Sequence, residues 1–228
     1  MPNLLPSDIH SPTGPPLAPP NAQQLTSLPD TARYSSKTRA VYDLLLPSLK
    51  QLRVVLGRVP DIGDCGHDTA DQQLRALGLL APHMTSRRLC SGYYENPATE
   101  DEYNLIRTSD STVSYPLTRD EYVKEVLISF EFRKQQREIR EKLGRCGPHD
   151  EKPAIWFGAM ERNALVKLLD LTYHTVQVNN EKLVVSSMGK GACHVWECLA
   201  PGHIMPLWKM SEDDDYSGIQ CSTSLIAS

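Results

Sequence analysis

The side chains best suited to chemistry gather near the C-terminal end of the chain. Cys193, His194 and Cys198 lie close together in sequence, and His203 follows five residues after Cys198. Thiolates and imidazoles are the ligands that Zn²⁺ prefers, usually four of them in a tetrahedral arrangement. In an extended strand, however, Cys193 would face away from His194 and Cys198, and the spacing matches no zinc finger or zinc knuckle. We therefore expect no metal and no cofactor, and these four residues are the candidate ligands should a metal bind.

Two other Cys/His pairs are present, Cys65 with His67 and Cys146 with His149, and either could complete such a site. A cysteine beside a histidine can also act as a nucleophile with its general base wherever the fold brings the two together. No flanking sequence marks an activated thiolate or an oxyanion hole. Signatures of phosphate-binding loops, dinucleotide-binding folds, zinc proteases and serine hydrolases are absent as well. The sequence therefore predicts a protein that is not an enzyme and has no catalytic residues.

One basic stretch, residues 133–145, could contact phosphate groups. On a helix, Arg133, Arg137 and Arg140 would lie along one side, where they could attract RNA, a nucleoprotein or an acidic membrane surface. Glutamates four residues before a lysine or an arginine in this stretch can pair with part of the charge. A solvated helix face is the alternative to a binding surface.

The N-terminal residues differ in composition from the rest of the chain, because eight of the 17 prolines lie among the first 30 residues. Two PxxP spacings, formed by Pro12, Pro15, Pro16 and Pro19, favour polyproline II and could bind a partner of the SH3 or WW type. We expect residues 1–34 to form a disordered tail, with or without such a partner.

Apolar residues at three- and four-residue steps predict several helices in the body of the protein. One covers about residues 41–56, where Pro47 predicts either a kink or a division into two short helices, and another covers residues 69–80. Residues 87–115 fit strands or ordered loops. A further helix is predicted over residues 161–172.

The clearest helix start is a capping-box pattern, in which Thr118 is followed three residues later by Glu121. Residues 123–133 after it fit a helix, although their alternation also fits a half-buried strand. We favour the helix, because good helix formers continue beyond the apolar residues.

Strands are predicted in the last part of the body. Residues 176–178 and 183–185 flank a polar Asn179-Asn180 turn, which is typical of a hairpin because Asn tolerates a positive φ. Residues 193–199 predict a third strand. The order of these elements indicates an α+β fold, with helices first and an antiparallel meander at the C-terminal end.

The bulk properties indicate one compact domain over residues 35–210, followed by a flexible acidic and polar tail over residues 211–228. The net charge of −4 argues against a globally basic nucleic-acid or membrane binder. We see no signal peptide and no run of apolar residues that could span a membrane. The six scattered cysteines are expected to be reduced thiols of an intracellular protein, cytoplasmic or nuclear.

The C-terminal end resembles that of rhabdovirus matrix proteins. Val195-Trp196 is followed by Leu207-Trp208, then by Met210-Ser211 and an acidic run from Glu212 to Asp215. The proline-rich N-terminus ahead of one α+β body is also similar, although the chain lacks a PPxY motif and a lysine-rich N-terminus. The resemblance implies a structural protein of the virion that acts in the host cytoplasm.

The sequence thus predicts a non-enzymatic structural or adaptor protein, which acts through contacts with other proteins and through self-association. The resemblance makes a viral matrix-type assembly protein the specific form of this prediction. The alternative is a small zinc-stabilised module that binds nucleic acid or regulates another protein. An enzyme of unrecognised type is the third hypothesis.

Overall fold

The computed structural model describes residues 36–51, 54–57, 59, 64–109, 117–129, 131–132, 157–180, 182–200 and 203–209. The two predicted tails lie outside these residues, as do the basic stretch with Arg133, Arg137 and Arg140 and the Cys146/His149 pair. The partners expected for the prolines and arginines, and the domain boundaries, stay predictions.

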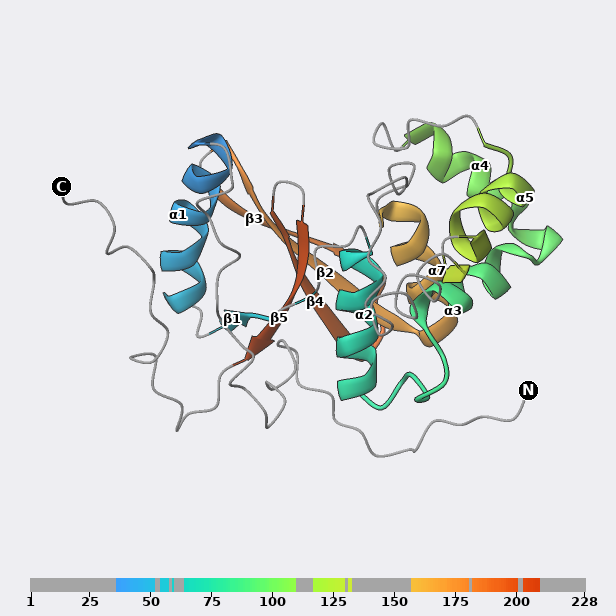
Figure 1. Ribbon diagram of the computed structural model, residues 1–228, viewed down its shortest axis with the longest axis horizontal. Helices are drawn as coiled ribbons and strands as arrows, with labels where there is room; N and C mark the ends of the chain where they lie inside the picture. Colours follow the sequence, from blue (N-terminus) through green and yellow to red (C-terminus); the bar gives the residue numbers. More distant parts are fainter. Residues whose placement is uncertain are drawn as a thin grey trace, which may run out of the picture.

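Five strands form one mixed sheet in the order β1-β5-β4-β2-β3 (Figure 1). The strands are β1 Val54–Leu56, β2 Leu171–Asn179, β3 Lys182–Met188, β4 Cys193–Ala200 and β5 His203–Lys209. Strands β2 and β3 form the predicted antiparallel hairpin, and Asn180 has a φ of 48° at its turn. Strand β5 pairs antiparallel with β4 and β1, so β1 joins the sheet from the N-terminal half of the chain.

Strand β4 runs parallel to β2 and not antiparallel to β3, which is where the sheet differs from the expected meander. After β3 the chain turns back at Gly189, whose φ of 87° suits glycine. Gly191 then passes so close to the backbone that an added Cβ would lie 1.7 Å from the Asp170 carbonyl oxygen. This close approach places Cys193 opposite Leu171, at the start of β2.

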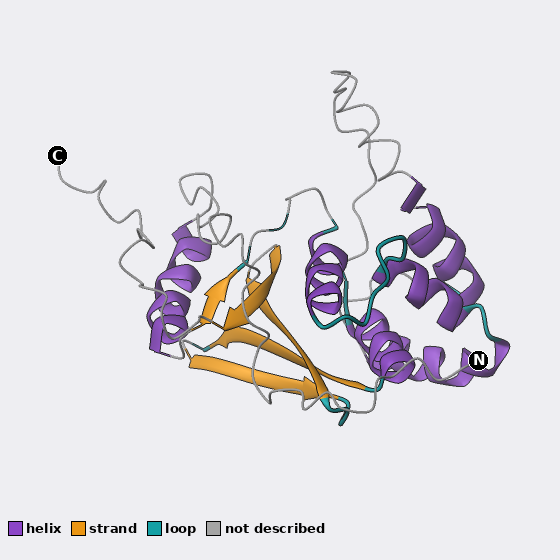
Figure 2. Ribbon diagram, turned by 90° about the horizontal axis from the view of Figure 1, so that it is seen from below, coloured by secondary structure: helices purple, strands orange, loops and turns teal. Residues whose placement is uncertain are grey.

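Helices lie on both sides of the sheet. They are α1 Ser36–Gln51, α2 Cys65–Ala76, α3 Ser86–Tyr94, the 3-10 helix η3 Pro97–Thr99, α4 Glu100–Ser109, α5 Arg119–Glu121, the π-helix η4 Tyr122–Ile128 and α7 Ala159–Leu169. Helix α1 lies on one side of the sheet, and the other described helices lie on the opposite side (Figure 2). None of the described helices is long and apolar enough to cross a bilayer. The predicted α+β class, with helices ahead of a C-terminal sheet, is confirmed.

Three buried tyrosines hold the helices beside the sheet together. Tyr94 of α3 packs edge-on against Tyr103 of α4 and Tyr122 of η4, with ring centroids 5.8 and 5.9 Å away. The Tyr94 hydroxyl donates to the Met160 carbonyl oxygen at 2.8 Å, and the Tyr122 hydroxyl donates to the buried carboxylate of Glu161. Burial, followed by the nearby Glu161 charge, raises the pKa of the Tyr122 phenol well above its usual value, so the phenol remains a donor.

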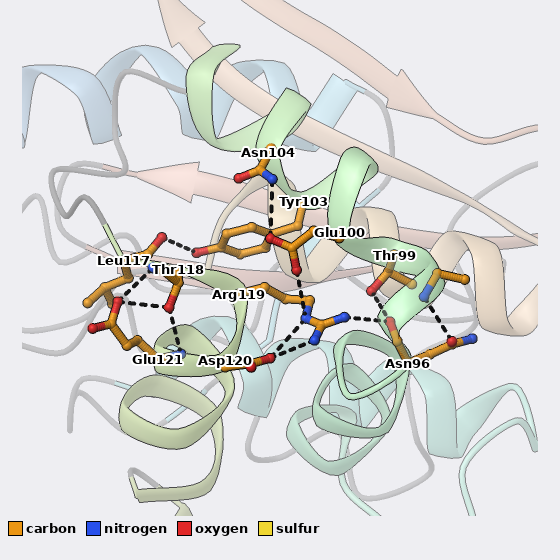
Figure 3. A network of polar contacts seen from close by, with 11 residues as sticks. Asn96, Thr99, Glu100, Tyr103, Asn104, Leu117, Thr118, Arg119, Asp120 and Glu121 are labelled. Carbon is orange, nitrogen blue, oxygen red and sulfur yellow. Dashed lines mark hydrogen bonds and ion pairs between the residues drawn. The ribbon is translucent and has the colours of Figure 1, made fainter.

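The predicted capping box is present at the start of α5 (Figure 3). The Thr118 hydroxyl accepts from the Glu121 amide at 3.3 Å, and the Glu121 carboxylate accepts from the Thr118 amide at 2.8 Å. Arg119 connects this helix start to the preceding helices, since it donates to the Asn96 carbonyl oxygen at 2.9 Å and pairs with Glu100 at 3.2 Å. The helical alternative is therefore confirmed for the described part of residues 123–133, which is π-helical up to Ile128 and α-helical at positions 129, 131 and 132.

Candidate active site at the N-terminus of helix α2

Cys65 is the first residue of the 12-residue helix α2, and its side chain is buried. Backbone N–H groups point outwards at the N-terminus of a helix, and the helix dipole is positive there. This position favours the ionised thiolate, which is the nucleophilic form of cysteine. Cys65 is thus placed where a cysteine can be activated.

Strand β5 meets this helix end through the backbone of Ile204. The Ile204 N–H donates to the Cys65 sulfur, with 3.4 Å between nitrogen and sulfur. The hydroxyl of Thr69, one turn along α2, donates to the Ile204 carbonyl oxygen at 3.1 Å. Side chains in the first two turns of α2 therefore bind both the N–H and the carbonyl oxygen of Ile204.

His203 is the residue directly before Ile204, and it is buried where β5 begins. Two covalent bonds connect the Ile204 nitrogen to the His203 Cα, so that Cα lies within roughly 6 Å of the Cys65 sulfur. The backbone of a buried histidine therefore lies close to a buried thiol from a distant part of the chain. This is the residue pair that thiol nucleophiles use.

The start of α2 is fixed from the other side by a buried ion pair. Arg87 of α3 pairs with the carboxylate of Asp64, the N-cap residue of α2, and its second terminal nitrogen donates to the Val126 carbonyl oxygen at 2.9 Å. Both charged side chains are almost fully buried. Removing one partner of such a pair leaves an uncompensated charge, so the Arg87 contact constrains the residue next to Cys65.

The two residues after Cys65 pack against Phe157 and α3. A Cβ added to Gly66 would lie 2.1 Å from the Phe157 Cβ, so this position needs glycine for close packing. His67 lies edge-on to the Phe157 ring with 4.9 Å between centroids, and its Nδ1 is 2.9 Å from the Ser86 hydroxyl. His67, the sequence neighbour considered with Cys65, therefore has a partner of its own in α3.

The other described cysteines have different environments. Burial, followed by the charge of Glu161, raises the pKa of the Cys90 thiol well above its usual value. Burial and the adjacent Glu197 carboxylate raise the pKa of Cys198 as well. Cys193 is half-buried at the start of β4. Among the described cysteines, Cys65 alone begins a helix.

The four candidate metal ligands do not gather into a site. Within the described ranges, no group of three or more His, Cys, Asp or Glu side chains could hold a metal ion. The register explains this, since His203 pairs with Ala200 at the end of β4 whereas Cys193 lies at the opposite end of that strand. His194 contacts His174 across the sheet, with 2.7 Å between their ring nitrogens.

No family model and no curated protein matches the chain. Among solved structures, the chain is similar to the OTU domain of OTUD1, with a TM-score of 0.47 and 10% identity over 75% of this chain and 96% of that domain.

The comparison corrects several expectations. The structure found is an OTU domain and not a rhabdovirus matrix protein, so the predictions of a matrix-type virion protein and of a non-enzymatic structural or adaptor protein are wrong. The tryptophan spacing has a reason within this fold, because Trp196 and Trp208 lie on the neighbouring strands β4 and β5. Trp208 is part of the buried interior, and Trp196 stacks on His174 with 4.0 Å between ring centroids.

Sequence reasoning missed the contact between the Cys65 sulfur and the backbone of Ile204, the residue after His203. The two lie far apart in the chain, since 139 residues separate Cys65 from Ile204. The helix start was also placed too late, because the helix predicted over residues 69–80 covers Cys65–Ala76. A cysteine at a helix N-terminus would have pointed to an activated thiol before any partner was known.

Proposed function

We propose that the protein is a thiol-dependent enzyme that cleaves acyl bonds, with Cys65 as the nucleophile and His203 as its general base. The contact that carries this proposal is the hydrogen bond from the Ile204 N–H to the Cys65 sulfur. It brings the residue beside His203 to the N-terminus of α2, and a donor aimed at sulfur favours the thiolate over the neutral thiol.

The reaction proceeds in two steps. His203 removes the proton of the Cys65 thiol, and the sulfur attacks the carbonyl carbon of an amide or ester to give a tetrahedral oxyanion. Backbone N–H groups at the N-terminus of α2 are suited to stabilise that oxyanion. When the carbon–nitrogen or carbon–oxygen bond breaks, the imidazolium returns its proton to the leaving amine or alcohol, and a thioester on Cys65 remains.

In the second step, water attacks the thioester carbonyl while His203 accepts a proton from the water molecule. The carbon–sulfur bond then breaks, the acid product leaves, and the proton returns to Cys65. The reaction needs no oxidant or reductant. A reducing intracellular compartment, which keeps thiols free, suits such an enzyme.

The reactivity of the thiol gives a direct test that needs no knowledge of the substrate. The folded protein is treated with iodoacetamide over a range of pH, and alkylation of each cysteine is followed by peptide mass spectrometry. All three side chains are buried, but we expect Cys65 to react before Cys90 and Cys198, because Cys65 lies at a helix N-terminus whereas burial and a nearby carboxylate raise the pKa of each of the other two. We also expect the pH midpoint for Cys65 to lie below about 8.5, the usual value for a free thiol.

A matched pair of histidine variants tests the base. His203→Gln should slow alkylation of Cys65 near neutral pH, whereas His83→Gln, at an exposed position, should leave the rate unchanged. A panel of p-nitrophenyl acetate, a peptide thioester and peptide amides then tests for an acyl group on Cys65 by intact mass. The proposal fails if Cys65 reacts no faster than Cys90 in the folded protein, or if Cys65→Ala keeps the hydrolysis observed with any of these compounds.

A further inference from the structure

Helix α2 presents a row of polar side chains to the sheet. Cys65, Thr69 and Gln73 are four residues apart, so they lie on the same face of the helix. All three are buried, and each makes a hydrogen bond to the backbone of β5. The row therefore connects the helix to the strand directly, by side chains that reach main-chain groups.

We infer that Thr69 is a positioning residue of the thiol site, which holds Ile204 so that its N–H stays directed at the Cys65 sulfur. This inference rests on the proposed function. Thr69 does not contact the sulfur in any described hydrogen bond, but its hydroxyl holds the carbonyl of the same residue whose N–H donates to Cys65. Because the two groups flank one Cα, a shift of the carbonyl changes the direction of the N–H.

The sheet alone does not fix this geometry. Pairing with β4 places Ile204 opposite Leu199, which sets the strand relative to its neighbour in the sheet but not relative to α2. The described hydrogen bonds between α2 and β5 come from Cys65, Thr69 and Gln73. Gln73 binds the Leu207 carbonyl oxygen at 2.6 Å, three residues beyond Ile204. Apart from Cys65 itself, Thr69 therefore makes the described hydrogen bond to β5 that lies nearest to the sulfur.

The substitution Thr69→Val removes the hydroxyl and keeps the shape of the side chain. We expect alkylation of Cys65 at neutral pH to slow by about 3- to 10-fold, the factor that corresponds to one hydrogen bond, and its pH midpoint to rise. Thr69→Ser keeps the hydroxyl and should restore both. A merely structural role would lower the stability without moving the pH midpoint of Cys65 in the folded protein.

The titratable neighbours of Cys65 are unchanged in these variants. They include His203 beside Ile204, the Asp64–Arg87 pair before the helix, and His67 and Asp68 in its first turn. A shift in the pH profile therefore reports the backbone donor. Thr108→Val is the matched control, because Thr108 is an exposed helical threonine whose hydroxyl also donates to a carbonyl oxygen, that of Asn104 at 3.0 Å.

The outcomes separate this inference from the proposed function. Folding of each variant is first checked by circular dichroism, and Thr69→Ala replaces Thr69→Val if the valine variant does not fold. A reactive Cys65 in the native chain that slows in this variant and recovers in Thr69→Ser supports the inference. Native reactivity with an unchanged rate and midpoint in the variant overturns the inference and leaves the proposed function standing. An unreactive Cys65 in the native chain overturns both.

Discussion

The side-chain amide of Gln73 completes the sheet at the point where β4 and β5 separate. The described pairing of these strands ends at Glu197 and Pro206. At the next position, Gln73 donates to the carbonyl oxygens of Trp196 and Leu207 at 2.5 and 2.6 Å, and it accepts from the Trp196 amide at 2.6 Å. One fully buried amide thus satisfies three backbone groups that no longer pair with one another.

The substitution Gln73→Leu keeps the size of the side chain and removes all three hydrogen bonds. A typical hydrogen bond contributes about 1 kcal/mol net, and a buried group left without a partner costs about 1–3 kcal/mol. Burial of the added apolar surface offsets part of this loss, by about 1–2 kcal/mol. We therefore expect the free energy of unfolding to fall by about 3–5 kcal/mol, a large share of the stability of a typical domain.

Urea unfolding followed by tryptophan fluorescence measures this change, since the midpoint and slope give the free energy of unfolding in water. The matched control is Gln72→Leu, at the neighbouring half-buried position of α2, where we expect a loss of at most about 1 kcal/mol. If Gln73→Leu is no more destabilising than this control, the amide does not connect the two strands in the way described.

Three further predictions concern other parts of the fold. Gly66→Ala should destabilise the protein by about 1–3 kcal/mol, because the added Cβ would overlap the buried Phe157 side chain. Gly92→Ala should stabilise the protein by about 0.5–1 kcal/mol, because there is open space around this position in α3. Thermal melts of both variants test this prediction. Glu197→Gln should lower the free energy of unfolding, measured in urea, by about 3–5 kcal/mol, because it leaves the largely buried guanidinium of Arg162 without its carboxylate partner. A loss below about 1 kcal/mol would contradict a buried ion pair. Burial and the adjacent imidazole lower the pKa of His174 to about 4. Between about pH 4 and 6.5 this side chain is therefore neutral in the folded protein and gains a proton on unfolding. The free energy of unfolding should thus fall as the pH drops through that range. His174→Asn should reduce this pH dependence, and an NMR titration midpoint near 6.5 in the native protein would refute the prediction.

Local signals gave correct predictions where a few adjacent residues decide the structure. The capping box needs only Thr118 and Glu121, three residues apart, and both of its hydrogen bonds are present. The hairpin depends on the positive φ of Asn180 and on alternation in the flanking strands. In both cases the partners are neighbours in sequence, so the pattern contains the interaction.

Predictions failed where the partner is distant. Val54 to Leu56 continue the apolar spacing of the preceding helix, yet they form β1 because β5 offers them an edge to pair with. The segment predicted as strands or loops contains α3 and α4, whose buried Tyr94 and Tyr103 pack on each other and on Tyr122. Tyrosine is common in strands, and only the packed cluster explains why these two lie on helices.

The sequence by itself determined the α+β class, the start of one helix and the hairpin, because those features follow from spacing and from residues within a few positions of each other. Only the tertiary structure placed Cys65 beside the strand that begins at His203. The sequence pattern pointed to Cys193, His194 and Cys198 on β4. His203, however, begins the next strand, and that strand contacts the N-terminus of α2 at Cys65. A contact across more than half of the chain leaves no periodic trace in the sequence, because it depends on how a helix packs against a strand and not on the residues next to either side chain.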